Sequence, residues 1–259
     1  MRARRSWRNG RDEVLAQGIP FSDLRVPTSI NQLPTADFYS AFYDELFRRY
    51  DNFEALPGEW RKNKTETAKA ISGKIPRNSR VLSFGCGLGY VEHQLLGMRA
   101  DIKLDVFDSA ANASKWLSEK HSDATFHRKD SSFGKYDVIY AQQVFYALPK
   151  SGLMDVLNIF ARSLNEGGVM ILINTSSKSI ENKSDGAEEK QSAVKLVKDF
   201  IRPFYLFVRI NTTSKRKGIQ FWGWQRDNDC YINYCIEAGF SLIEMARAVN
   251  QSFLTFHLR

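Results

Sequence analysis

The sequence predicts an α/β fold in which helices cover a mainly parallel sheet. Between Arg80 and Asn174, short apolar runs of strand length alternate with segments whose apolar residues recur at helical spacing. A glycine-rich turn at residues 85–89 follows the first of these runs. A chain of 259 residues, of which 43% are hydrophobic, is long enough to bury a substantial core. We therefore expect one α/β domain with appendages.

Five apolar runs supply the expected parallel strands. Each run is apolar enough to be buried on both faces, as strands of parallel sheets usually are. The crossovers between them are expected to be right-handed. In chain order the runs are RVLSF, IKLDVF, ATFHR, YDVIYA and VMILIN.

Apolar spacing also predicts the helices and the last strands. Residues 153–164 place apolar side chains on one helical face before a turn at 165–168, which predicts a helix packed on the sheet. A further helix is expected from Asp227 to Ala238, followed by a glycine that ends it. SLIEMARAV and QSFLTFHLR then alternate as two strands joined around Asn250. These two strands predict a closing antiparallel hairpin.

Two segments are expected outside the sheet. Residues 1–75 are interpreted as a basic tail and a helical lid, and residues 76–259 as the main domain. In the first segment, residues 36–50 interleave aromatic and charged side chains at helical spacing, so this helix needs a partner to pack on. A polar stretch rich in serine and lysine opens an insertion at about 175–224, expected to be part loop and part helix. Both segments could cover the carboxyl ends of the strands, where open α/β sheets bind ligands.

Composition narrows the class of protein. A net charge of +8 would favour a polyanionic partner, but five arginines lie within the first eleven residues and need not form a binding face. Three cysteines form no CxxC pair and no histidine cluster accompanies them, which predicts reduced thiols and no metal site. No apolar run reaches the roughly 18 residues of a membrane span, and the N-terminus lacks the apolar core of a secretory signal. We expect a cytoplasmic protein, and the composition indicates no oligomeric state.

The stretch VLSFGCGLGYVEHQLL predicts a site for a nucleotide-like ligand. It places Gly85, Gly87 and Gly89 where a buried strand turns into a helix, and glycine there lets the backbone approach a ligand closely. A nicotinamide-type G-x-G-x-x-G/A pattern counted from Gly85 would end at Tyr90, and no GK[ST] follows as in a P-loop. Asp108 ends the second strand about twenty residues later, where an acid can accept both hydroxyls of a ribose. It could also cap a helical segment expected to begin directly after it.

Five stretches resemble the successive motifs of class I S-adenosylmethionine (SAM)-dependent methyltransferases. In order they are VLSFGCGLG, VFDSA, RKDSSF, KYDVIYAQQVFYAL and SLNEGGVMILIN. The resemblance spans residues 80–174 and, more weakly, the C-terminal helix and hairpin. It implies a Rossmann-like three-layer sandwich with a mostly parallel seven-stranded sheet in the order 3-2-1-4-5-7-6. It also implies SAM as methyl donor, S-adenosylhomocysteine (SAH) as product, and no metal.

The resemblance assigns cofactor roles by position. The glycine loop would carry the methionine and ribose portions, Asp108 the ribose hydroxyls, and Asp130 the adenine amino group, although Asp130 could equally be a turn residue. Ser83 stands where the family usually has an acid that helps to orient the methionine end, and serine can still bond through its hydroxyl or a water. Gln142 would lie beside the transferred methyl group. The other candidate cofactor residues neighbour these positions: Cys86, Ser109 and Ser131.

The methyl acceptor is expected to be a small molecule. Transfer from a sulfonium depends mainly on alignment of acceptor, methyl and sulfur in a dry site, so a dedicated acid and base are optional. Tyr146, just past the fourth strand, is the candidate base for a hydroxyl acceptor. Aromatic lids favour a ring-bearing or carbohydrate acceptor, that is, a hydroxyl of a metabolite or of a surface glycan. The candidate acceptor-binding side chains, each with core packing as the alternative, are Tyr39, Tyr43, Trp222 and Trp224.

Two other functions remain open. The basic N-terminus and the run at residues 215–217 would suit a nucleic-acid methyltransferase, but AQQVFYAL lacks the [DNS]-P-P-[FYW] motif of many such enzymes. A non-catalytic binding protein with the same fold is the third interpretation, suggested by Ser83 and by the absence of an obvious base.

Overall fold

The computed structural model describes residues 4–9, 35–128, 133–175, 219–248 and 251–259, and every structural statement below concerns these residues. Within them, no helix is both long enough and apolar enough to cross a membrane.

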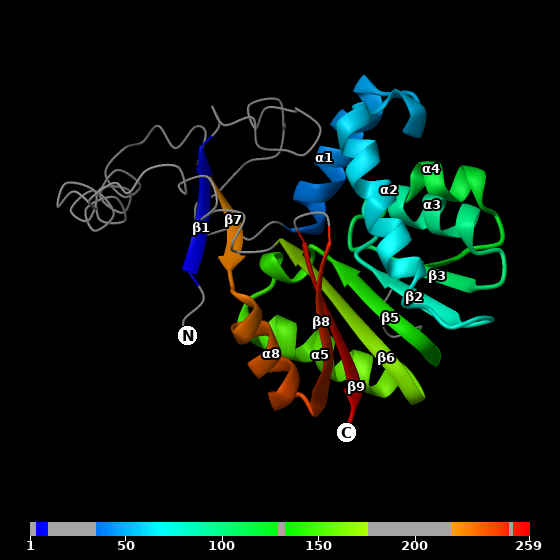
Figure 1. Cartoon of the computed structure of the whole chain (residues 1–259). Helices are drawn as coiled ribbons and strands as arrows, with labels where there is room; N and C mark the ends of the chain where they lie inside the picture. Colours follow the sequence, from blue (N-terminus) through cyan, green and yellow to red (C-terminus); the bar gives the residue numbers. More distant parts are fainter. Residues whose placement is uncertain (1–3, 10–34, 129–132, 176–218, 249–250) are drawn as a thin grey trace, which may run out of the picture.

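A seven-stranded sheet forms the centre of the molecule (Figure 1). Its strand order is β4-β3-β2-β5-β6-β9-β8; the first five strands are parallel, and β9 runs antiparallel to both of its neighbours, β6 and β8. Numbered within this sheet along the chain, the order is 3-2-1-4-5-7-6, so the predicted topology is confirmed. The strands are β2 (Arg80–Phe84), β3 (Lys103–Phe107), β4 (Thr125–His127), β5 (Tyr136–Gln142), β6 (Leu164–Thr175), β8 (Phe240–Ala248) and β9 (Gln251–Leu258).

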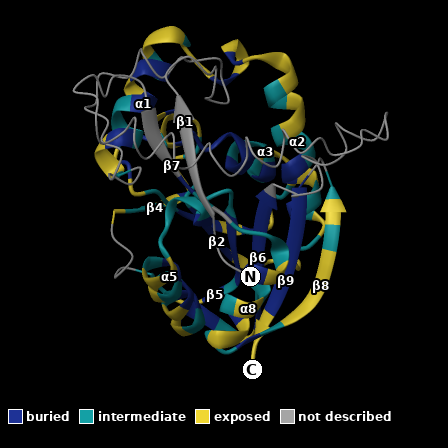
Figure 2. Ribbon diagram, turned by 90° about the vertical axis from the view of Figure 1, so that its left-hand side faces the viewer, coloured by how far each residue is buried: buried dark blue, intermediate teal, exposed yellow. Residues whose placement is uncertain are grey.

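Helices cover both faces of the sheet, because successive strand residues point to opposite sides. Val81 of β2 belongs to a buried cluster with helices α1 to α4, whereas Leu82 belongs to a second cluster with α5 and α8. Figure 2 shows β6 and β9 as buried and the edge strand β8 as largely exposed. The helices are α1 (Ala36–Arg49), α2 (Gly58–Ser72), α3 (Tyr90–Met98), α4 (Lys115–Lys120), α5 (Lys150–Ser163) and α8 (Asn228–Glu237), with short 3-10 turns η2 (Phe53–Ala55) and η4 (Phe145–Ala147).

Capping side chains set the limits of the predicted helices. Thr35 caps α1 by accepting a hydrogen bond from the amide of Phe38 at 3.3 Å. Asp227 caps α8 by accepting from the amide of Cys230 at 2.8 Å. The helical segment expected directly after Asp108 is wrong, because the chain turns there and α4 begins only at Lys115.

A second, two-stranded sheet lies beside the first (Figure 1). In it, β1 (Arg4–Asn9) pairs antiparallel with β7 (Ile219–Gln225). The sequence predicted neither strand, since it interpreted the first segment as a basic tail and the second as the end of the insertion. The pairing joins segments more than two hundred residues apart, which local patterns do not reveal. Residues 176–218 of the insertion lie outside the described residues, and the division of the chain after residue 75 stays a prediction.

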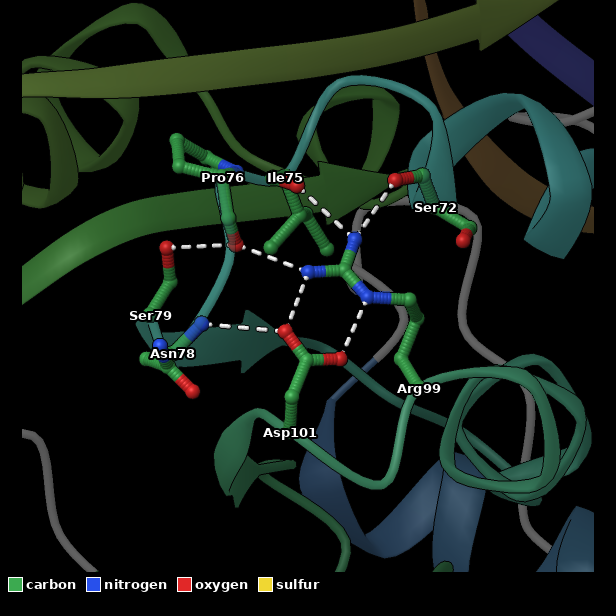
Figure 3. Close-up of polar contacts among 7 residues, drawn as sticks. All are labelled: Ser72, Ile75, Pro76, Asn78, Ser79, Arg99 and Asp101. Atoms are coloured by element: carbon green, nitrogen blue, oxygen red, sulfur yellow. Dashed lines mark hydrogen bonds and ion pairs between the residues drawn. The ribbon is translucent and has the colours of Figure 1, made fainter.

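Arg99, which ends α3, joins two connections at the amino ends of the strands (Figure 3). Its guanidinium donates to the backbone carbonyls of Ser72, Ile75 and Pro76 at 2.8–2.9 Å. It also contacts both carboxylate oxygens of Asp101, at 2.7 and 2.8 Å. These contacts hold the pKa of Asp101 well below its ordinary value, chiefly through the hydrogen bonds from Arg99. The α2–β2 connection is thereby fixed to the start of β3.

Replacing Arg99 by methionine should destabilise the fold by about 1–2 kcal/mol, because three carbonyls and a carboxylate lose their charged donor. The melting temperature should then fall by about 2–6 °C in a thermal melt followed by circular dichroism. Arg77→Met, on the exposed side of the same connection, is the matched control. The difference between wild type and Arg99→Met should be full above the unfolded carboxyl pKa of roughly 3.9 and shrink as the pH falls from there toward the lowered pKa of folded Asp101, because the unfolded chain then binds a proton that the folded protein does not. Equal melting temperatures for all three proteins at neutral pH would contradict this role.

Candidate functional site

The glycine loop between β2 and α3 adopts a backbone that favours glycine. The φ angles of Gly85, Gly87 and Gly89 are +75°, +57° and +78°, in the left-handed region. A Cβ atom at Gly85 would collide with the side chain of Val144, and one at Gly89 would lie 2.6 Å from the Cβ of Leu117. Both the backbone conformation and the packing therefore require the glycines that the sequence singled out.

Asp108 connects this loop to the end of β3. Its Oδ2 accepts a hydrogen bond from the amide of Gly87 and its Oδ1 accepts one from the amide of Ala110, both at 2.9 Å. Burial raises the pKa of Asp108, and these backbone donors oppose the rise. Asp108 thus caps a turn, and its two oxygens keep lone pairs that can accept further hydrogen bonds, as the two hydroxyls of a ribose would require.

Helix α1 lies over the loop. The hydroxyl of Tyr43 is 2.9 Å from the position that a Cβ at Gly87 would take. The side chain of Asn112, in the turn after β3, donates to the carbonyl of Ser40 at 2.8 Å and to the carboxylate of Asp44 at 2.6 Å. These contacts fix α1 against the carboxyl ends of β2 and β3, and its buried side chains also pack in the cluster with α2 to α4.

Two tyrosine hydroxyls meet at this edge of the sheet. The hydroxyl of Tyr39 lies 2.6 Å from that of Tyr146, which belongs to η4 just after β5. Burial, followed by the neighbouring Tyr146, raises the pKa of Tyr39 well above its ordinary value of 10. Tyr43 packs against Tyr39 with ring centroids 6.4 Å apart. The structure therefore brings the candidate base together with two of the four candidate acceptor-binding residues.

Ser83 is buried at the end of β2 and does not face solvent. Its hydroxyl donates to Oε1 of Glu92 on α3 at 2.6 Å, and the hydroxyl of Tyr140 donates to the same oxygen at 2.7 Å. Sequence reasoning missed Glu92. The sequence does contain a signal for it. Glu92 lies in the first turn of the helix after the glycine loop, and Ser83 stands where the family usually has an acidic residue.

The remaining candidates are placed as follows. The thiol of Cys86 lies in the loop, and burial raises its pKa well above the ordinary value, so it stays protonated. Ser109 is exposed, whereas Gln142 ends β5 with a buried Nε2 that has no hydrogen-bond partner among the described residues. Trp224 lies on β7 beneath the guanidinium of Arg226, 5.5 Å from its ring centre.

Three candidates cannot be placed. Asp130 and Ser131 lie outside the described residues, and the side chain of Trp222 does so as well. Their assigned roles stay predictions.

The chemistry of the loop and its neighbours fits SAM. Asp108 offers acceptors for ribose hydroxyls, the glycine backbone admits close approach, and Glu92 offers a second carboxylate on the other side of the loop. The described residues contain no group of three or more histidine, cysteine, aspartate or glutamate side chains able to hold a metal ion.

Comparison with known families assigns the chain to a family. Residues 53–250 match the family model described as a methyltransferase domain. The chain belongs to this family, the class I SAM-dependent methyltransferases. The assignment confirms that the predicted enzyme class, a methyltransferase, is right. No curated protein matches the chain by sequence.

Solved structures share the fold at low sequence identity. The magnesium protoporphyrin IX methyltransferase ChlM from Synechocystis PCC 6803, with bound SAH, aligns with a TM-score of 0.58 and 14% identity over 85% of this chain and 96% of its own. CalO1, a methyltransferase in calicheamicin biosynthesis with bound SAH, aligns with a TM-score of 0.54 and 13% identity over 86% of this chain and 58% of its own. Human N-acetylserotonin methyltransferase in complex with SAM aligns with a TM-score of 0.52 and 14% identity over 86% of this chain and 56% of its own. The chain thus spans little more than half the length of the last two proteins.

Replacing Asp108 by alanine should weaken SAH binding by about 10- to 100-fold, because the ribose hydroxyls lose a carboxylate acceptor. Isothermal titration calorimetry on the purified full chain measures the change. Asp123→Ala, which removes an exposed carboxylate in the turn before β4, is the matched control and should bind SAH within twofold of wild type. A folded Asp108→Ala protein with wild-type affinity would remove Asp108 from the cofactor site.

Proposed function

We propose that this methyltransferase transfers the methyl group of SAM to a hydroxyl of a small-molecule acceptor, on a metabolite or on a sugar such as that of a surface glycan. The observation that carries the proposal is the pair of hydroxyls of Tyr39 and Tyr146, 2.6 Å apart, beside the glycine loop. These groups can orient an O–H donor, and the aromatic rings of α1 around them suit an acceptor of small size.

Similar structures support an acceptor of this scale. The proteins compared above act, by their names, on magnesium protoporphyrin IX and on N-acetylserotonin, or belong to calicheamicin biosynthesis. Another similar structure, with a TM-score of 0.53 and 11% identity, is the mitomycin 7-O-methyltransferase MmcR. O-methylation of a ring-bearing molecule is therefore the acceptor chemistry we favour.

When bound, SAM supplies a methyl group already activated by the positive charge on sulfur, so the protein has mainly to position the acceptor and exclude water. Tyr39 stays protonated at neutral pH because its pKa is raised, and it can donate its hydroxyl hydrogen to Tyr146. The oxygen of Tyr146 can then accept the hydrogen bond of the acceptor hydroxyl. This contact orients the acceptor oxygen and polarises its O–H bond, and the proton released when that oxygen is methylated passes to bulk solvent.

The observations give less support to a nucleic-acid acceptor. Its sequence argument rested on the basic N-terminus, which contains strand β1, and on residues 215–217, which lie outside the described residues. The alternative becomes an outcome of the activity test.

Replacing Tyr146 by phenylalanine should lower kcat by at least about tenfold, because the acceptor hydroxyl loses its hydrogen-bond acceptor, and should leave SAH affinity within twofold. The assay follows SAH formation with a panel of phenols, hydroxylated heterocycles and sugars as acceptors. Tyr234→Phe, on α8, is the matched control. Transfer only to RNA or DNA, with binding that falls steeply as salt is added, would contradict the proposed acceptor class. Unchanged kcat in Tyr146→Phe would contradict the role of this tyrosine.

A further inference from the structure

Glu92 is a buried carboxylate that is only half satisfied. Its side chain is 2% exposed. Oε1 accepts both hydrogen bonds described above, from Ser83 and Tyr140, while Oε2 is buried with no hydrogen-bond partner among the described residues. Burying a carboxylate oxygen without a hydrogen-bond donor costs folding free energy. A bound ligand that donates to this oxygen is one way to offset that cost.

The surroundings place the carboxylate of Glu92 beside the candidate site. Ser83, which holds Oε1, lies two residues before Gly85, at the end of the strand that leads into the loop. The charge of Glu92 also acts on Tyr43 and Cys86, which lie over and within the loop. Glu92 thus approaches the loop from α3, and Asp108 approaches it from β3.

The charges around Glu92 leave room for a cation. Lys64 on α2 carries a positive charge that acts on Glu92, but it forms no direct ion pair with Glu92 among the described residues. Burial lowers the pKa of Lys64 to about 8, the opposite of the change that a close ion pair would cause. Asp108 is already bonded to backbone amides and suits neutral hydroxyl donors, whereas the unpartnered Oε2 of Glu92 suits a positively charged donor.

We propose that Glu92 binds the ammonium group of the methionine portion of SAM and SAH, with Ser83 and Tyr140 holding its carboxylate in place. In this chain the acidic residue for the ammonium group is Glu92 of helix α3. Ser83, near the end of β2, orients its carboxylate. The inference rests on the cofactor of the family and is independent of the acceptor class proposed above.

The test compares two ligands in calorimetric titrations of the full chain, without any acceptor. SAH carries the amino-acid portion, whereas 5′-methylthioadenosine keeps the adenosine and the thioether and lacks the ammonium group. Glu92→Gln should weaken SAH binding by about 10- to 100-fold and leave methylthioadenosine binding within twofold. Asp105→Asn, which removes an equally buried carboxylate bonded to Arg80, His127 and Tyr136, is the matched control and should leave the preference for SAH unchanged.

A second variant returns the acid to the strand. In Ser83→Asp/Glu92→Gln, the aspartate lies next to the position of the lost carboxylate, so most of the preference for SAH over methylthioadenosine should return. Equal losses of affinity for both ligands in Glu92→Gln, with a lowered melting temperature, would show a purely structural role and overturn the proposal. Wild-type affinity for SAH in Glu92→Gln would overturn it as well. Neither result would bear on the proposed acceptor, since no acceptor is present.

Discussion

The hydrogen bond from the amide of Gly87 to the carboxylate of Asp108 is the interaction on which the site depends. It joins the turn after β2 to the end of β3, and the amides of Gly85 and Cys86 bond to the carbonyl of Phe107 in the same place. A loop that must bend back over the neighbouring strand needs positive φ angles, and its three glycines supply them. The parallel sheet thus brings the carboxyl ends of β2 and β3 together. The glycine loop and Asp108, which follow these ends, form the candidate ligand site.

Three carboxylates, of which Asp105 and Glu92 are buried and Asp108 is half-buried, differ in how many of their oxygen lone pairs are used within the fold. Burial alone would raise the pKa of Asp105, but donors from His127, Tyr136 and Arg80 together lower it, and the group is fully engaged in packing. Burial raises the pKa values of Asp108 and of Glu92 and is the largest cause in each. Both keep oxygen lone pairs unused, and both lie at the glycine loop.

The sequence predicted the parts of the structure that are coded locally. The strands, the glycine loop, the position of Asp108 and the sheet order agree with the structure, because each depends on short patterns or on one motif series. The expected burial on both faces is wrong for β4, which lies at the edge of the sheet with Thr125 exposed and Phe126 and His127 half-buried. Contacts between residues far apart in the sequence could not be predicted. Tyr39 and Tyr146 were both named as candidates, yet their contact spans 107 residues and no local pattern predicted it. Glu92 was missed because its importance follows from a hydrogen bond to Ser83, which is visible only in three dimensions.

A crystal structure of the full chain with SAH tests the account most directly. We expect the ribose hydroxyls within about 3 Å of the Asp108 carboxylate and the amino group within the same distance of Glu92 Oε2. SAH bound away from the glycine loop, or with its ribose directed away from Asp108, would contradict the central claim that this loop and this acid form the cofactor site.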